Sequence, residues 1–299
     1  MLRESFNKVV VEGQLVELES RQDDTTIDLD SGKTVPCKYV AITAHIDAGD
    51  GNIVPIDAYS KSTTKAGKEN KVYKSLMTVL DTYQSRGVAG DRGDFIKVTG
   101  GSLEENLFVG DDGSTVSGPK IRSNFFNRAT GEISPKSQFT LELCIISMEP
   151  EVTFSGEETG SLVITGGVVG YAGKINLLKF HVDNQQGVQF FEKNCSPGDT
   201  VKVGGEAVFK TEKTVIEIDS EDIGFGEPLK DERERKVKRF VITTSSKPYD
   251  EDEAFNTDLV KQGLVNRESF IEQKKAEKSG PAKPAQGFGG FGGAAPRKF

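Results

Sequence analysis

The chain uses one short phrase twice, and this repeat limits its fold more than any other feature. Residues 93–101 read GDFIKVTGG, and residues 198–205 read GDTVKVGG. A looser pair, VVVEG at residues 9–13 and LVITG at residues 162–166, precedes the two copies in the same order. Gly-Asp forms a turn, the alternating apolar residues form a half-buried strand, and the paired glycines allow a bend or a close backbone approach. The repeat predicts one small β-fold present twice.

The order of elements in the first copy indicates which β-fold this is. Alternating apolar residues predict strands over residues 8–20, 33–46 and 53–59. The spacing of apolar residues then changes to that of a helix over residues 68–84, before the Gly-Asp phrase begins the next strand. Three strands, a helix and further strands up to residue 148 follow the order of an OB-fold, a five-stranded Greek-key barrel.

The second copy is shorter in sequence. Its first three strands are predicted at residues 162–170, 174–182 and 188–191, and residues 192–198 leave no room for a full helix before the phrase. Later strands are predicted at residues 199–209 and 214–219, with residues 237–244 as an added strand.

The predicted fold class is therefore all-β with minor α: two tandem OB-fold-like five-stranded barrels and a disordered C-terminal tail. We place the first barrel at residues 1–148, with its inserted helix at 68–84, and the second at 149–247. Residues 248–278 contain an acidic run and a predicted helix. Residues 279–299, rich in Gly and Phe, bury too little apolar surface to fold.

Composition narrows the class of protein. The formal net charge of −8 argues against a uniformly basic nucleic-acid-binding surface, but a basic groove on an acidic body remains open. The three cysteines are far apart and only two histidines accompany them, which argues against a structural zinc site. No metal or cofactor is expected. We expect a cytoplasmic protein, because no secretory leader or membrane-spanning run is apparent.

Catalytic motifs are absent from the sequence. It contains no Gly-x-Ser-x-Gly, no Walker A sequence and no His-Glu-x-x-His, and the glycine pairs are not followed by a helix start that could bind phosphate. We therefore predict that the protein is not an enzyme. A barrel-based nuclease would need a cluster of carboxylates around a metal ion.

Aromatic and cationic residues on the non-core faces of the strands predict binding to a single-stranded nucleic acid, because bases stack on rings and cations neutralise phosphates. Each such ring could instead cap a barrel end or pack under a loop. The candidates in the first copy are Tyr39, Tyr59, Arg86, Arg92, Phe95, Lys97, Lys120, Arg122, Phe126 and Arg128. Those in the second copy are Lys179, His181, Phe191 and Lys202. Phe288, Phe291 and Phe299 in the tail are candidates for binding a protein partner.

These residues and motifs resemble the single-stranded-DNA-binding proteins of bacteria and their phages. The resemblance rests on the apolar first strand, the Gly-Asp-x-[Ile/Val]-Lys-Val phrase, the helix before it and the Gly-rich tail that ends in Phe299. It implies an OB barrel that stacks bases on strand aromatics, and a C-terminal tip that binds replication or recombination proteins. Two features differ: that family usually carries one OB-fold per chain and an acidic tip, whereas residues 296–299 (PRKF) are basic.

The resulting hypothesis is a phage-encoded protein of the host cytoplasm. It would bind and protect single-stranded DNA, without strong sequence preference, during replication, recombination or repair. The main alternative is a structural or assembly protein, such as a virion β-barrel component, that uses its barrels for protein–protein contacts.

Overall fold

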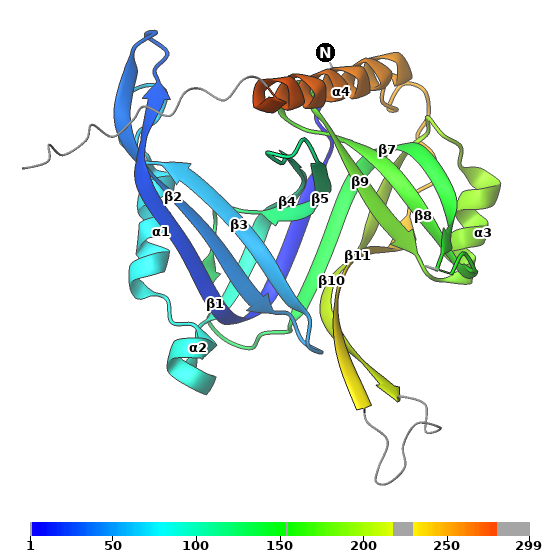
Figure 1. Cartoon of the computed structure of the whole chain (residues 1–299), viewed down its shortest axis with the longest axis horizontal. Coiled ribbons are helices and arrows are strands. Elements are labelled where there is room, and N and C mark those ends of the chain that lie inside the picture. The colour runs from blue at the N-terminus through cyan, green and yellow to red at the C-terminus, as the bar shows by residue number, and fades with distance from the viewer. Residues whose placement is uncertain (1, 154, 218–229, 280–299) are drawn as a thin grey trace, which may run out of the picture.

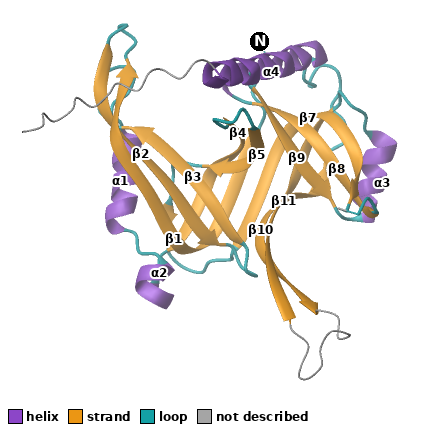
Figure 2. Ribbon diagram, in the orientation of Figure 1, coloured by secondary structure: helices purple, strands orange, loops and turns teal. Residues whose placement is uncertain are grey.

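The computed structural model describes residues 2–153, 155–217 and 230–279, and most of these lie in β-strands (Figure 2). The strands are β1 (Asn7–Asp28), β2 (Thr34–Asp47), β3 (Ile53–Lys61), β4 (Phe95–Val109), β5 (Thr115–Arg122), β6 (Asn127–Arg128), β7 (Lys136–Val152), β8 (Glu158–Val169), β9 (Ile175–Val182), β10 (Thr200–Glu217) and β11 (Lys230–Ser245). The helices are α1 (Lys71–Thr82), α2 (Arg86–Ala89), α3 (Gln185–Asn194) and α4 (Thr257–Ser279), with 3-10 turns at Gly90–Arg92 and Tyr171–Gly173.

The strand pairing closes two rings of identical order (Figure 1). In the first ring, β1 pairs with β2 and β4, β2 with β3, and β4 with β5, and a parallel contact between β3 and β5 completes the ring. In the second, β7 pairs with β8 and β10, β8 with β9, and β10 with β11, and a parallel contact between β9 and β11 completes it. Each ring is an OB-type five-stranded barrel, which confirms the predicted tandem fold.

The helix between the third and fourth strands is present in both barrels. In the first, α1 lies within the predicted range 68–84; the Asn70 side chain accepts a hydrogen bond from the Val72 N–H, and Leu76 is buried. In the second barrel, α3 occupies the stretch predicted as a third strand at residues 188–191. The strand predicted at residues 188–191 is wrong, and so is the predicted lack of a full helix before the fourth strand, because α3 takes up residues 185–194 behind an Asn184 cap.

The boundary between the barrels also differs from the predicted one. Residues 137–148, assigned to the first barrel, lie in β7, which is the first strand of the second ring. Strand β7 also pairs with β1, with Val9 opposite Phe139, so the two barrels share a continuous ladder. Residues 162–166 accordingly belong to the second strand of their barrel, β8, and do not correspond to residues 9–13. Strand β11 closes the second barrel and is not an added strand.

The repeated phrase begins the fourth strand of each barrel. Val98 in β4 and Val203 in β10 point into the core, and both are at most 1% exposed. A Cβ atom on Gly205 would lie 1.9 Å from the carbonyl oxygen of Val241, and the pairing of β10 with β11 shifts register at Gly204 and Gly205. The close backbone approach predicted for the paired glycines is therefore confirmed in the second copy.

Helix α4 lies across the ends of both barrels (Figure 1). It confirms the helix predicted within residues 248–278, and it contacts β4 of the first barrel and β9 of the second. Gly263 packs directly on Ile175, where an added Cβ atom would lie 2.5 Å from the Ile175 side chain. No helix in the described residues has the length and apolar character needed to span a membrane. The tail at 280–299, including Phe288, Phe291 and Phe299, lies outside the described residues.

The glycine contact provides a test of the fold. We expect Gly205→Ala to lower the free energy of unfolding by about 1–3 kcal/mol, because the methyl group collides with backbone that must move. Gly118→Ala is the matched control, since Gly118 is also a strand glycine but a Cβ atom added to it would meet no other atom within 4 Å. Urea unfolding measures the free energy of unfolding of both variants. An equal loss of stability in Gly205→Ala and Gly118→Ala would contradict this account.

Candidate nucleic-acid interface

One outer face of the first barrel gathers several of the predicted residues. Strands β2 and β3 turn Val40, Ile42 and Ile56 into the core and leave their alternate residues outside. Together with β5 they surround a hollow of ≈ 550 Å³. We call this the first-barrel face; it is lined by Ala41, Ile42, Thr43, Asp57, Ala58, Tyr59, Lys120 and Arg122, and Tyr39 borders it through its contact with Tyr59.

Two tyrosines form the aromatic part of this face. The ring centroids of Tyr39 and Tyr59 lie 5.6 Å apart with the planes tilted by 32°. Tyr59 is 37% exposed, so part of its ring is open to solvent. Desolvation raises the pKa of Tyr59, and Cys37 and Tyr39 raise it further, against a smaller opposing effect of Arg122. The phenol is therefore neutral at physiological pH and does not repel a phosphate.

The cations of this face come from β5 and from the second barrel. Arg122 lies 3.5 Å from Glu104, a separation too long for a strong hydrogen bond. Lys238 on β11 is close enough to Asp57 and Lys120 for all three charges to interact. Loss of hydration lowers the pKa of Lys238 most, and Lys120 lowers it further, whereas Asp57 raises it. The effect of Asp57 on Lys238 is larger than that of Lys120, so the carboxylate of Asp57 already offsets the repulsion between the two lysines.

Several predicted cations are instead held in ion pairs. Lys97 lies 2.8 Å from Glu12, a buried carboxylate that also contacts Lys136 at 3.3 Å. The hydrogen bond from Lys97 is the main cause of the lowered pKa of Glu12, against the opposing effect of burial. Arg86 pairs with Asp47 at 2.9 Å. These side chains stabilise the barrel wall.

Arg128 is held in the same way. Its guanidinium lies 3.0 Å from Asp94 and stacks over the ring of Tyr83 at 4.5 Å. Arg92 and Phe95 are exposed, with Phe95 at 40%, but they belong to the segment around α2 and the start of β4. The structure does not bring them into the hollow that contains Tyr59.

Two predicted aromatic residues are part of the core. Phe126 is 7% exposed and Phe191 is 1% exposed. Phe191 faces inward because it lies on α3, and Phe190 on the same helix is only partly buried. Their assignment to a binding surface is wrong, since a loop and a helix here replace the strands on which the predicted side-chain directions depended.

The corresponding face of the second barrel is occupied by an ion-pair network. Arg239 contacts Glu151 at 3.1 Å and Asp183 at 2.8 Å, and His181 Nδ1 lies 3.1 Å from Glu151. Burial lowers the pKa of His181 most and Arg239 lowers it further, whereas Glu151 and Asp183 raise it. Lys179 is exposed on the same strand, β9.

Lys202, the counterpart of Lys97, points elsewhere. Its Nζ atom lies 4.6 Å from the ring centroid of Phe6, near the N-terminal end of β1. The two lysines of the repeated phrase therefore make different contacts, one with a buried carboxylate and one with a ring.

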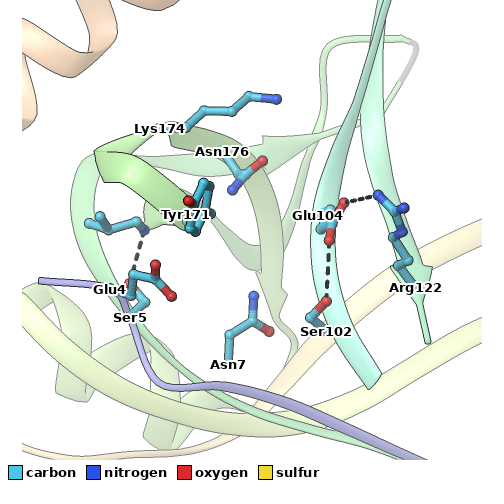
Figure 3. A pocket seen from close by; sticks show the side chains of 11 residues that line it. Glu4, Ser5, Asn7, Ser102, Glu104, Arg122, Tyr171, Lys174 and Asn176 are labelled. Atoms are coloured by element: carbon cyan, nitrogen blue, oxygen red, sulfur yellow. Dashed lines mark hydrogen bonds and ion pairs between the residues drawn. The ribbon is translucent and has the colours of Figure 1, made fainter. Parts of the chain in front are cut away.

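A pocket of ≈ 470 Å³ lies between the barrels (Figure 3). Figure 3 shows Tyr171 and Lys174 of the second barrel on one side, and Glu104 and Arg122 of the first barrel on the other. Tyr171 and Lys174 were not among the residues predicted from the sequence. A signal was available, because Tyr171 stands in a Gly-Tyr-Ala-Gly turn between two strands, where a ring has no core to enter.

A buried ion pair fixes the walls of this pocket. The Glu105 side chain of β4 is fully buried and accepts hydrogen bonds from Arg267 Nε at 2.8 Å, from Ser117 at 2.5 Å and from the Leu177 N–H at 3.2 Å. Arg267 belongs to α4 and Leu177 to β9, so one carboxylate joins both barrels and the helix. Burial raises the pKa of Glu105, but Arg267, Ser117 and Leu177 outweigh it, and the net pKa is lowered.

Among the described residues, one group has the donor atoms of a metal site. Glu17, Glu19 and His45 offer ligand atoms within 4.8 Å of one another on β1 and β2. Glu19 lies 3.5 Å from His45 Nε2, and Glu17 faces His45 across the ladder. Cross-strand contacts between side chains that share one face of β1 and β2 account for this arrangement. The cysteines at 37, 144 and 195 are free and buried, and burial raises the pKa of Cys144 and Cys195 to about 11.

Comparison with known proteins places the chain in a family. The sequence pattern of the YorF family matches residues 5–277. The chain belongs to the YorF family. No curated protein matches it. A solved structure similar to it is a deletion mutant of the single-stranded DNA binding protein from Thermus aquaticus, at a TM-score of 0.42 and 13% sequence identity, covering 83% of this chain and 97% of that one.

Removing the shared carboxylate tests the junction. We expect Glu105→Gln to lower the free energy of unfolding by about 3–5 kcal/mol at neutral pH, because Arg267 keeps its charge and loses its buried partner. The double variant Glu105→Gln, Arg267→Met should recover part of this loss. Urea unfolding measures both. A single variant as stable as the parent chain would contradict the role given to the pair.

The same pair predicts a pH dependence. Glu105 has a lowered pKa in the folded state, whereas in the unfolded chain a glutamate titrates near 4.3. Its stabilising effect is therefore complete above pH ~4.3 and is lost as the pH falls through the lowered folded value. Unfolding measured from pH 7 down to pH 3 should show a smaller acid-induced loss of stability in Glu105→Gln than in the parent chain.

Proposed function

We propose that the first-barrel face binds single-stranded DNA without strong sequence preference. The observation that carries the proposal is the Tyr39–Tyr59 pair, with Tyr59 partly open to solvent, beside Lys120 and Arg122 on β5. In OB-folds the face formed by the second and third strands is a common binding surface for oligonucleotides. Base–aromatic stacking beside backbone-tracking cations is the usual means of binding single strands.

The chemistry of the face supports low sequence preference. Every base has a π-face, so stacking on Tyr59 tolerates any sequence. The Thr43 hydroxyl is already used, since it donates to Asp57 at 3.0 Å. The formal net charge of the chain is −8, so the positive charge that binds phosphates has to be local. Lys120, Arg122 and Lys238 would supply it.

The wider role belongs to the same proposal. The protein would protect single strands during DNA replication, recombination or repair, without catalysing a reaction. A phage origin, action in the host cytoplasm and contacts of Phe288, Phe291 and Phe299 with replication proteins are further parts of this hypothesis.

The test is fluorescence anisotropy with labelled poly-dT and a duplex of equal length, at low and high salt. We expect tight binding of the single strand and weak binding of the duplex. Affinity should fall steeply with salt, because bound lysines and arginines release counterions from the phosphates. Absence of binding to poly-dT at low salt would overturn the proposal. If sedimentation then showed that the protein self-assembles without nucleic acid, the assembly-protein alternative would be favoured.

Two substitutions locate the site. Tyr59→Ala should weaken binding to poly-dT by about 1–3 kcal/mol, whereas Tyr59→Phe keeps the ring and the affinity. Lys120→Gln should make the slope of log affinity against log salt concentration less steep by about 1, the change expected for the loss of one phosphate contact. The control is Lys71→Gln, an exposed lysine at the start of α1. If Lys71→Gln weakens binding as much as Lys120→Gln, the site is not on the first-barrel face.

A further inference from the structure

The first-barrel face and the pocket between the barrels meet at one residue, Arg122. Arg122 lines both hollows, so a chain that leaves the first-barrel face beside Arg122 enters the inter-barrel pocket. The pocket volume of ≈ 470 Å³ falls within the range of about 300–1,000 Å³ that is usual for ligand sites. The second barrel supplies the opposite wall through the turn between β8 and β9.

Tyr171 presents an aromatic ring to this pocket. The residue is 86% exposed, so the ring is open to solvent and accessible to a base. The turn is tight: Ala172 and Gly173 have φ of 57° and 77°, and the Gly170 N–H donates to the Lys174 carbonyl at 2.7 Å. Because the backbone beneath the ring is already ordered, stacking a base on it costs little conformational entropy.

The cations that line the pocket could bind the phosphate of a single strand of nucleic acid. Lys174 is exposed and has no ion pair within the described parts of the chain, and Arg122 is only loosely paired with Glu104. These cations can take the phosphate of one strand. Glu4 and Glu104 line the same pocket and repel phosphates, so a phosphate bound here has to lie beside Lys174 and Arg122 and away from these carboxylates.

We infer that the inter-barrel pocket holds a nucleotide of the single strand that continues from the first-barrel face, with its base stacked on Tyr171 and its phosphate contacted by Lys174 and Arg122. This inference rests on the proposed function and extends it across both barrels. The buried Glu105 junction keeps the two walls in fixed positions, so the site exists before the strand binds.

The experiment compares two lengths of oligo-dT, about 5 and about 20 nucleotides, since one OB-fold occupies about 4–16 nucleotides. Tyr171→Ala should bind the long oligomer about 5- to 140-fold more weakly, the range expected for the loss of one stacked base, and should bind the short one unchanged. Tyr171→Phe should bind both like the parent chain. Lys174→Gln should weaken binding of the long oligomer but not of the short one. Lys71→Gln should leave the binding of both oligomers unchanged.

The outcomes separate this inference from the proposed function. Tyr59→Ala tests the first-barrel face and should weaken both oligomers. If the parent chain binds both lengths but Tyr171→Ala binds the long one as tightly as the parent does, the inference is wrong and the proposed function stands. Equal weakening of both lengths by Tyr171→Ala would also overturn it. If the parent chain binds neither length, both are wrong.

A second measurement reports contact directly. A long oligomer with 5-iodouracil in place of thymine should form a photocrosslink at Tyr171, because crosslinking needs a ring stacked on the base. Mass spectrometry of the digested complex locates the link. Crosslinks confined to Tyr39 and Tyr59 would contradict the inference.

Discussion

The buried contact between Glu105 and Arg267 joins the two barrels and α4, and together with the continuous ladder between β1 and β7 it fixes how the barrels are arranged. A carboxylate removed from water is costly unless every oxygen has a partner, and Glu105 has Arg267, Ser117 and the Leu177 N–H. These partners come from three parts of the fold, so the contact forms only when α4, β5 and β9 lie in their final positions. A buried ion pair is weak evidence for stability, but it strongly selects one geometry. The pocket beside Tyr171 depends on that geometry.

Local pattern predicted the elements well where each strand or helix is regular. The Gly-Asp phrase correctly marked the fourth strand of both barrels, and the spacing of Leu76 and Val79 marked α1. Pattern failed for β7 because strand alternation does not reveal pairing: the same strand lies beside β1 and within the second barrel. It failed for α3 because Val188 and Phe190, two residues apart, fit one face of a short strand, whereas Val188 and Phe191, three residues apart, fit one face of a helix.

The candidate site was predictable in part, for a related reason. Alternation along β2 and β3 correctly placed Tyr39 and Tyr59 outside the core. Alternation could not separate the cations that are available for binding from those held in ion pairs. Whether a lysine is paired depends on a carboxylate from another strand. Lys97 and Lys120 look alike in sequence, yet only Lys97 lies against the buried Glu12. Tyr171 lies in a turn, and its role depends on the opposite barrel, which sequence order does not place nearby.

The two barrels share a topology but differ in what their outer faces can bind. In the first, Tyr59 is partly open to solvent, and Arg122 lies 3.5 Å from its carboxylate partner Glu104. In the second, Arg239 already pairs with Glu151 and Asp183, so a phosphate that bound Arg239 would have to displace these carboxylates. The same fold thus gives one face open to an anion and one face closed by its own ion pairs. Under the proposed function, a single strand that continues from the first-barrel face would reach the second barrel at its β8–β9 turn, at Tyr171 and Lys174, rather than at its sheet.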